Sequence, residues 1–393
     1  MNKKILLVGC GSEIGSMLLS MNDFKKDGFV IDTVLTNFAQ NSKKNVSDSM
    51  DAVFARLILS NPQIFDKANL NYKNQIIKIK NRKIKFYFGD IKNFKLSKIK
   101  KKFDATIIAT SKKHISNKNL MKKFLKISKY VFGVAESKNL PSIYPNLLNV
   151  QTKIYGKKPK FIEDFKDKIF ALGSCQSNGW QAQLRGLIGS FDNSNLKSFK
   201  MVGTELDIIH PDTPQGRLGT KSDKPRDQDA RNNFRPSFSQ AKISMNKIFP
   251  KIHKVHTVSL RTLITPPGYQ IARFNFKYEL KNSKRINRDT LINKLRAFSE
   301  KSPDILRISK GTLGSKAYEM LETAAVILAD KEYIYYKEDP YFLNTSQNRV
   351  NNLCQVIMQA YVHNTRGYCR SVLNCLKSII KNPKKNKKIH CWI

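Results

Sequence analysis

Cys175 and His210 are the residues of this chain best suited to covalent chemistry. The apolar run over residues 170–172 leads into Cys175, and helical character follows from residue 180. A cysteine at the start of a helix has a stabilised thiolate, and neighbouring backbone N–H groups can hold an oxyanion. His210 ends a strand-like run, so it could take the thiol proton as a base. A buried structural cysteine and an isolated structural histidine are the competing interpretations.

Three glycines indicate a nucleotide-binding loop. An apolar run over residues 4–9 ends in Gly9, and Gly11 and Gly15 follow before a helical pattern. Glycine lets the backbone approach a pyrophosphate, and the N-terminus of the following helix supplies positive potential. The spacing is one residue longer than the usual GxGxxG, and a tight turn without a ligand is the alternative.

The second strand indicates which dinucleotide would fit. A dinucleotide-binding fold usually has an acidic residue at the tip of this strand, where it binds the ribose hydroxyls. Asp32 lies inside the predicted strand 29–36, and Asn37 stands at its tip. Lys43 and Lys44 follow closely, so the 2′-phosphate of NADP would not be repelled. We therefore expect NAD or NADP as the cofactor.

The spacing of the strand-like apolar runs along the chain predicts two kinds of sheet. Strands separated by helix-length segments predict a parallel α/β sheet. These strands are expected over residues 4–9, 29–36, 83–88, 104–110 and 130–134. After about residue 190 the strand-like runs come closer together, which predicts a mixed or antiparallel sheet. They span residues 198–209, 256–265 and 270–278. Helices are expected over residues 286–300, 349–361 and 369–380.

The length of 393 residues is that of two or three domains. We predict a Rossmann-type dinucleotide-binding domain over residues 1–173 and an α+β catalytic domain over residues 174–357. A C-terminal helix, 358–380, is expected to pack back on the first domain. A basic tail, 381–393, is expected to be solvated at its lysines, although its last residues are apolar enough to dock.

The chain is strongly basic, with 71 Lys and Arg against 30 Asp and Glu and a net charge of +41. This excess could indicate a nucleic-acid or other anionic partner. The abundance of lysine, asparagine and isoleucine favours compositional drift instead, so we expect at most weak, nonspecific nucleic-acid binding.

The six cysteines show neither a disulfide framework nor a zinc-binding spacing, and no metal is expected. No apolar run is long enough to span a membrane, and we expect a cytoplasmic protein.

Several motifs together resemble the phosphorylating glyceraldehyde-3-phosphate dehydrogenases over nearly the whole chain. The nucleophile motif Ser-Cys-Thr-Thr-Asn is similar to the segment from Ser174 through Cys175 to Asn178. His210, with Thr213 three residues later, matches the strand-end histidine and a phosphate-binding threonine. Three further segments, 232–242, 263–266 and 361–368, are similar to family motifs. All occur in the family order and at family-like separations.

The resemblance implies a mechanism and an assembly. Cys175 would attack an aldehyde to give a thiohemiacetal, and His210 would take the proton and steady the oxyanion. Hydride would pass to NAD(P), leaving a thioester for inorganic phosphate to cleave. Asn364 would orient the nicotinamide carboxamide, and Tyr368 would pack beside it. A phosphorylated aldehyde is the implied substrate, and a homotetramer is the implied assembly.

The resemblance also implies anion-binding residues, and some positions depart from it. Contacts to phosphate are implied for Ser174, Thr213 and Ser239, with Arg231 as the first choice of arginine and Arg226 as the second. Thr110 stands at the cofactor loop after the fourth strand. Gln176 replaces a phosphate-binding threonine, and Gln240 replaces a glycine. Another phosphorylated aldehyde, or hydrolysis in place of phosphorolysis, is therefore compatible with the sequence.

Two other interpretations stay open. A non-catalytic relative could bind nucleic acid or another anion through its basic surface, but it would need none of Cys175, His210 and Asn364. An aspartate-semialdehyde-type dehydrogenase has the same chemistry and a related fold, but its nucleophile motif usually lacks the Ser-Cys-x-x-Asn form.

Overall fold

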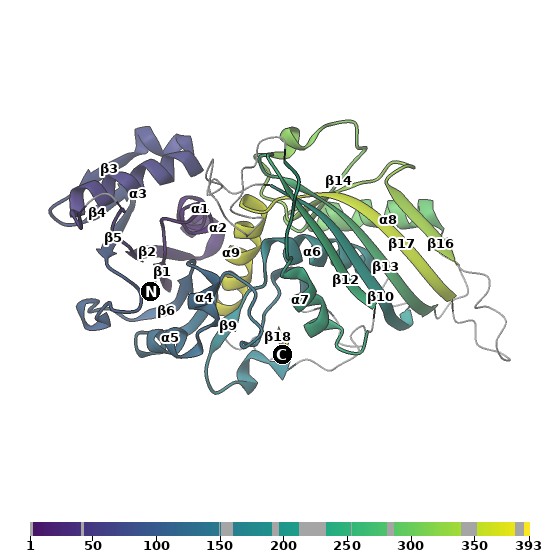
Figure 1. Ribbon diagram of the computed structural model, residues 1–393, viewed down its shortest axis with the longest axis horizontal. Helices are drawn as coiled ribbons and strands as arrows, with labels where there is room; N and C mark the ends of the chain where they lie inside the picture. The colour runs from purple at the N-terminus through teal and green to yellow at the C-terminus, as the bar shows by residue number, and fades with distance from the viewer. Residues whose placement is uncertain are drawn as a thin grey trace.

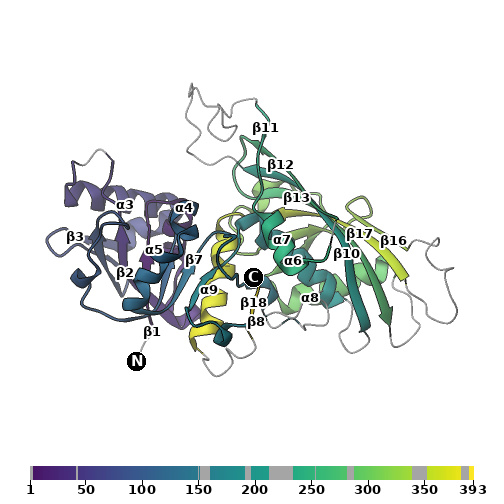
Figure 2. The same ribbon diagram turned by 60° about the horizontal axis from the view of Figure 1, so that its bottom comes forward.

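A computed structural model shows two domains with one long helix, α9, between them (Figure 1). Figure 2 shows the same arrangement from a second direction. The structure describes residues 3–40, 43–148, 150, 160–190, 196–211, 233–252, 254–280, 287–338, 352–381 and 389–393. Of the helices in these ranges, none is both long enough and apolar enough to cross a membrane.

The first domain is a Rossmann-like α/β domain, as the sequence predicts. Its eight-stranded sheet has the order β3-β4-β5-β2-β1-β6-β7-β9. Neighbours from β5 to β9 are parallel, and β3 and β4 extend the sheet as antiparallel strands. The strands are β1 (Lys3–Val8), β2 (Phe29–Thr36), β3 (Ala68–Asn71), β4 (Ile76–Ile79), β5 (Arg82–Phe88), β6 (Phe103–Ile108), β7 (Ser128–Gly133) and β9 (Ile169–Ala171). The helices are α1 (Glu13–Met21), α2 (Phe24–Asp27), α3 (Val46–Ser60), α4 (Lys112–Ser116) and α5 (Lys118–Lys123).

The position of β1 inside the sheet explains why its sequence is an unbroken apolar run. Ile5 and Leu7 point into a core shared with α1, α3 and α9, whereas Leu6 and Val8 point into the core on the other face, beneath α4 and α5. A parallel strand covered on both faces has no polar side to show, so periodicity of two disappears from its sequence.

The second domain is built on a mixed, largely antiparallel sheet, again as predicted. Its order is β11-β12-β10-β13-β17-β15-β14, with β16 paired to β17. The strands are β10 (Leu196–Pro211), β11 (Arg235–Pro236), β12 (Lys254–Thr262), β13 (Gly268–Leu280), β14 (Leu306–Ser309), β15 (Ala325–Leu328), β16 (Ile334–Glu338) and β17 (Asn352–Val362). Helices α6 (Cys175–Ser190), α7 (Ala241–Ile248) and α8 (Arg288–Lys301) share the core of this sheet.

The helix predicted over residues 349–361 is wrong, because β17 occupies this segment and pairs with β13 along its length. The alternate residues Cys354, Val356, Met358 and Ala360 are buried in the core of the domain. The outward face also carries apolar residues, among them Ile357. Apolar residues on both faces hide the alternation that identifies a half-buried strand.

The chain ends against the first domain. Strand β18 (His390–Cys391) pairs with β8 (Lys160–Phe161), and Trp392 exchanges backbone hydrogen bonds with Ser142. Trp392 is buried and stacks on Tyr144. The apolar end of the predicted basic tail therefore docks, whereas residues 382–388 lie outside the described residues.

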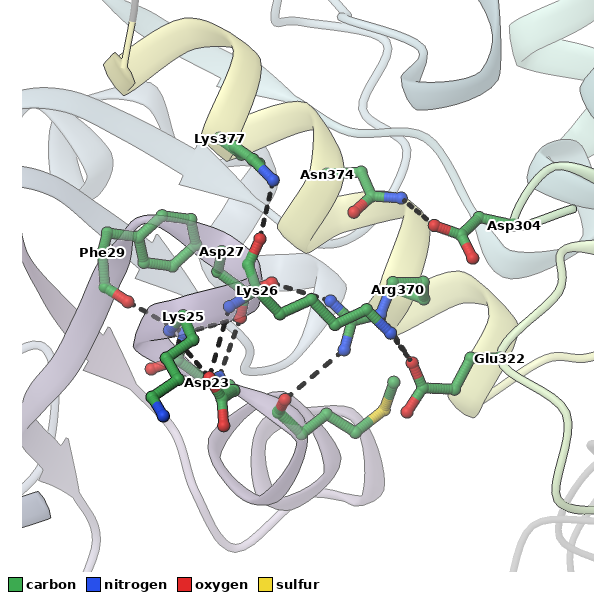
Figure 3. A network of polar contacts seen from close by, with 12 residues as sticks. Asp23, Lys25, Lys26, Asp27, Phe29, Asp304, Glu322, Arg370, Asn374 and Lys377 are labelled. Carbon is green, nitrogen blue, oxygen red and sulfur yellow. Dashed lines mark hydrogen bonds and ion pairs between the residues drawn. The ribbon is translucent and has the colours of Figure 1, made fainter. Parts of the chain in front are cut away.

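Helix α9 (Arg366–Lys381) joins the two domains through the polar network in Figure 3. Arg370 is 1% exposed, and its Nη1 lies 2.7 Å from Oδ1 of Asp27, which is equally buried. Nε of Arg370 donates to Oε2 of Glu322 in the second domain, also at 2.7 Å. Farther along the helix, Asn374 donates to Asp304 and Lys377 donates to the carbonyl of Lys26. The helix thus holds both domains through one buried guanidinium.

We expect Arg370→Met to lower the free energy of unfolding by about 3–5 kcal/mol, because it leaves the Asp27 carboxylate buried without its partner. Adding Asp27→Asn to this variant should recover part of the loss. Lys377→Met is the matched control, since it removes a cation from the same helix at a half-buried position, where the ammonium group binds a backbone carbonyl. Urea unfolding monitored by circular dichroism measures all three. A loss in Arg370→Met no larger than in the control would contradict the assignment.

Candidate functional site

One cavity gathers half of the site residues predicted from the sequence. It has a volume of about 480 Å³ and lies where the loops after β1 and β7 face the second domain. The predicted residues that line it are Gly11, Ser174, Cys175, His210, Ser239, Asn364 and Tyr368. The carboxyl edge of a parallel sheet is where such folds bind their ligands. A larger cavity of about 830 Å³, near Arg82, is lined by none of the predicted residues.

The glycine loop packs tightly under α1. Gly9 has a φ of +95°, and a Cβ there would lie 2.7 Å from the carbonyl oxygen of Ala109. A Cβ on Gly15 would lie 1.8 Å from the carbonyl oxygen of Gly9, so neither position accepts a side chain. Thr110 also contacts Gly9 and so supports the loop rather than lining the cavity. Gly11 has open space around it and faces the cavity.

The tip of β2 is as the sequence predicts. Asp32 lies within the strand and forms an ion pair with Lys101. Asn37 follows the last residue of the strand and is exposed. No acidic residue occurs in the sequence between Thr36 and Asn45. A carboxylate in the usual ribose-binding place is therefore missing from this strand tip.

Helix α6 begins at the candidate nucleophile because the preceding serine caps it. The backbone N–H of Ser177 donates to Oγ of Ser174 at 3.2 Å, and the N–H of Ser174 donates to Oγ of Ser177 at 2.8 Å. This reciprocal pairing satisfies two N–H groups at the helix start. Gly173, with a φ of +74°, turns the chain just before it, and the Tyr368 hydroxyl donates to the Gly173 carbonyl at 2.7 Å. Cys175 is thereby fixed at the first position of α6.

The first turn of α6 is also tied to α9. Nδ2 of Asn178 donates to Oγ of Ser371 at 3.2 Å, and Asn146 donates to both oxygens of Asn178 at 3.0 Å. Because all three side chains are buried, these bonds leave the helix start little freedom to move.

Burial disfavours the thiolate form of Cys175. Although part of its surface opens to the cavity, the dense packing around the sulfur raises the pKa of Cys175 to about 11. The charge of Glu13 raises this pKa further, and the charge of Arg261 lowers it. The sequence predicted a stabilised thiolate from the helix start alone, and burial outweighs that effect.

His210 ends β10 and lines the same cavity as Cys175. Its Nδ1 lies 2.6 Å from the carbonyl oxygen of Pro211. A carbonyl oxygen can only accept, so in a neutral ring Nδ1 carries the proton and the lone pair lies on Nε2. This is the tautomer that a general base needs.

Two arginines of the cavity wall were missed by sequence reasoning. Arg261 on β12 is 8% exposed and stands opposite His210 in the parallel register of β10 and β12. Its Nη1 lies 3.4 Å from the same Pro211 carbonyl that holds His210. Arg56 on α3 lies on the wall near Glu13 and the glycine loop. The pairing of strands 198–209 and 256–265 would have identified Arg261, but the sequence did not fix their register.

Three predicted phosphate-binding residues, Thr213, Arg226 and Arg231, lie outside the described residues. Ser239 is buried, and its Oγ accepts a hydrogen bond from the N–H of Ala241 near the start of α7. Within the described ranges, His, Cys, Asp and Glu side chains form no cluster of three or more that could hold a metal ion.

No family model matches the chain, and no curated protein matches it. The resemblance to the dehydrogenase family therefore depends on the order and spacing of its motifs alone.

We expect alkylation of Cys175 by iodoacetamide to accelerate about tenfold per pH unit between pH 7 and 10, because the thiolate fraction grows at that rate below a pKa of about 11. Glu13→Gln should speed the reaction at pH 7, and Arg261→Gln should slow it, since these charges shift the pKa in opposite directions. Mass spectrometry of the labelled peptide gives the rate. A rate that is already constant above pH 8 would contradict this account.

Proposed function

We propose that this protein is an NAD(P)-dependent aldehyde dehydrogenase that oxidises a phosphorylated aldehyde through a thioester on Cys175. The observation that carries the proposal is the shared cavity: Cys175 and His210 line it together with the glycine loop and Asn364. A non-catalytic binding protein has no use for this combination.

The chain's own residues supply nucleophile, base and oxyanion donors. The sulfur of Cys175 attacks the aldehyde carbon, and Nε2 of His210 accepts the thiol proton. Backbone N–H groups at the start of α6 would stabilise the oxyanion that forms. NAD(P), when bound, would accept the hydride that leaves the thiohemiacetal carbon. An oxygen of inorganic phosphate or of water then attacks the thioester carbon and breaks the C–S bond. The attacking group releases its proton to solvent, and the proton held by His210 returns to the thiolate.

The cavity wall fits a dinucleotide. Gly11 leaves open space at the loop, and the start of α1 supplies backbone N–H groups beside it. Nε of Arg56 is buried and has no hydrogen-bond partner among the described residues, as expected of a group awaiting a pyrophosphate oxygen. Glu13 lies on the same wall, and burial raises the pKa of its carboxyl. Asn364 would contact the carboxamide of the nicotinamide ring.

The second domain supplies the groups for the substrate. The buried guanidinium of Arg261 lines the cavity near Cys175 and favours an anionic aldehyde. Hydroxyl groups of Ser174, Ser237, Ser239 and Ser259 share this cavity. Phosphate oxygens accept hydrogen bonds from both kinds of donor. The uncharged strand tip at Asn37 is compatible with NADP as well as NAD.

We expect the protein to reduce NAD or NADP when given phosphorylated aldehydes, with a faster steady state in the presence of inorganic phosphate if phosphorolysis is the second step. Cys175→Ser should abolish turnover. His210→Asn should slow it by roughly 10²–10⁴, the usual contribution of a general base. Absorbance at 340 nm measures each rate.

Cys391→Ala is the matched control for these variants, because this cysteine is buried in β18 and does not line the cavity. Its turnover should stay within a factor of about two of the unmodified chain. Aldehyde oxidation by Cys175→Ser at a rate comparable to the control would rule out the covalent mechanism.

A further inference from the structure

A chain of buried amide groups runs from the cavity wall into the second domain. Nε2 of Gln176 donates to Oδ1 of Asn364 at 3.2 Å, and Nε2 of Gln270 donates to Oε1 of Gln176 at 2.6 Å. At the far end, Nε2 of Gln183 donates to Oε1 of Gln270 at 3.0 Å. The four residues are between 0% and 5% exposed, so water cannot readily replace these bonds. We call the segment from Gln270 through Gln176 to Asn364 the amide relay.

One backbone carbonyl fixes the direction of the amide relay. Nε2 of Gln270 also donates to the main-chain oxygen of Gln176 at 2.9 Å. A main-chain oxygen can only accept, so the group that Gln270 presents to Gln176 must be its NH₂. The side chain of Gln176 must then present its oxygen to Gln270 and its NH₂ to Asn364. This argument holds without any separate assignment of amide nitrogen and oxygen.

The consequence falls on Asn364. Its oxygen is engaged by Gln176, and among the described residues none accepts a hydrogen bond from its Nδ2. Asn364 lines the cavity, so the part of its amide left for a ligand is a donor.

We propose that the amide relay makes Asn364 a fixed hydrogen-bond donor, so that this site selects a ligand with an acceptor, such as the carbonyl oxygen of a nicotinamide carboxamide. The inference rests on the proposed function for the identity of that ligand. It makes Gln176 a positioning residue, because its side chain is hydrogen-bonded to Asn364 and Gln270. Gln176 therefore does not take over the phosphate contact of the family threonine whose position it occupies.

Two analogues of NAD separate the possibilities. In 3-acetylpyridine adenine dinucleotide the ring substituent offers an acceptor and no N–H, whereas 3-aminopyridine adenine dinucleotide offers an N–H donor. The unmodified protein should bind the acetyl analogue at least tenfold more tightly than the amino analogue. The N–H groups of the amino analogue would meet the N–H groups of Asn364, and neither can accept a hydrogen bond. Isothermal titration calorimetry at pH 8 measures both dissociation constants without turnover.

Gln176→Glu should reverse this preference. An ionised carboxylate can still accept from Gln270 but cannot donate to Asn364, so Asn364 must turn its NH₂ toward residue 176 and its oxygen toward the cavity. Gln176→Met, which releases Asn364 without burying a charge, should reduce the preference to about threefold or less. Gln176→Met also tests the relay if the buried carboxylate of Gln176→Glu prevents folding.

Gln181→Met is the matched control, because Gln181 lies on the same helix, is equally buried and has no hydrogen-bond partner for its amide among the described residues. It should keep the tenfold preference. Equal binding of the two analogues by the unmodified protein, or an unchanged preference in both Gln176 variants, would overturn the relay. Failure of NAD, NADP and both analogues to bind would instead overturn the proposed function, and this inference with it.

Discussion

The buried guanidinium of Arg370 is the interaction on which the rest of the structure depends. It is almost completely shielded from water, and its charge is balanced by Asp27 from the first domain and Glu322 from the second. A buried charge is tolerated only where its partners are present, so α9 can settle in this place only when both domains are folded against it. The first turn of the same helix carries Tyr368, which binds the carbonyl just before the helix of Cys175. The contact between the domains and the position of the candidate nucleophile are therefore both set by α9.

A second tie between the domains shapes the wall of the cavity beside Ala135. Lys247 on α7 extends its ammonium group to Glu136, at 3.3 Å, and to the carbonyl oxygens of Ser137 and Leu140. Both charges are buried, and every one of these contacts crosses from the second domain to the loop after β7. Together with α9, this pair fixes the two sides of the cavity. Arg56 comes from the first domain and Arg261 from the second. This arrangement suits the dinucleotide that we propose on one side of the cavity and the anionic substrate that we propose on the other.

The elements of the first domain and the start of α6 could be predicted from local sequence, because residues close together in the chain determine them. The apolar run of β1, the glycines that α1 must approach closely and the helix that starts at Cys175 all depend on neighbours in the chain. Features that depend on distant residues could not be predicted. Arg261 meets His210 only through the register of two strands, and the thiol of Cys175 has a raised pKa only because the folded chain packs around it. The segment of β17 is wrongly predicted as a helix because apolar residues, among them Ile357, occur on both of its faces.

The central claim is that Cys175 carries an acyl group during oxidation of an aldehyde. Its most direct test is the mass of the protein quenched with acid after mixing with a phosphorylated aldehyde and NAD(P) in the absence of inorganic phosphate. The account predicts an added mass equal to the acyl group, found on the peptide that contains Cys175, only when both aldehyde and cofactor are present. Oxidation of the aldehyde with no adduct at any stage, or with an adduct on a different residue, would contradict it.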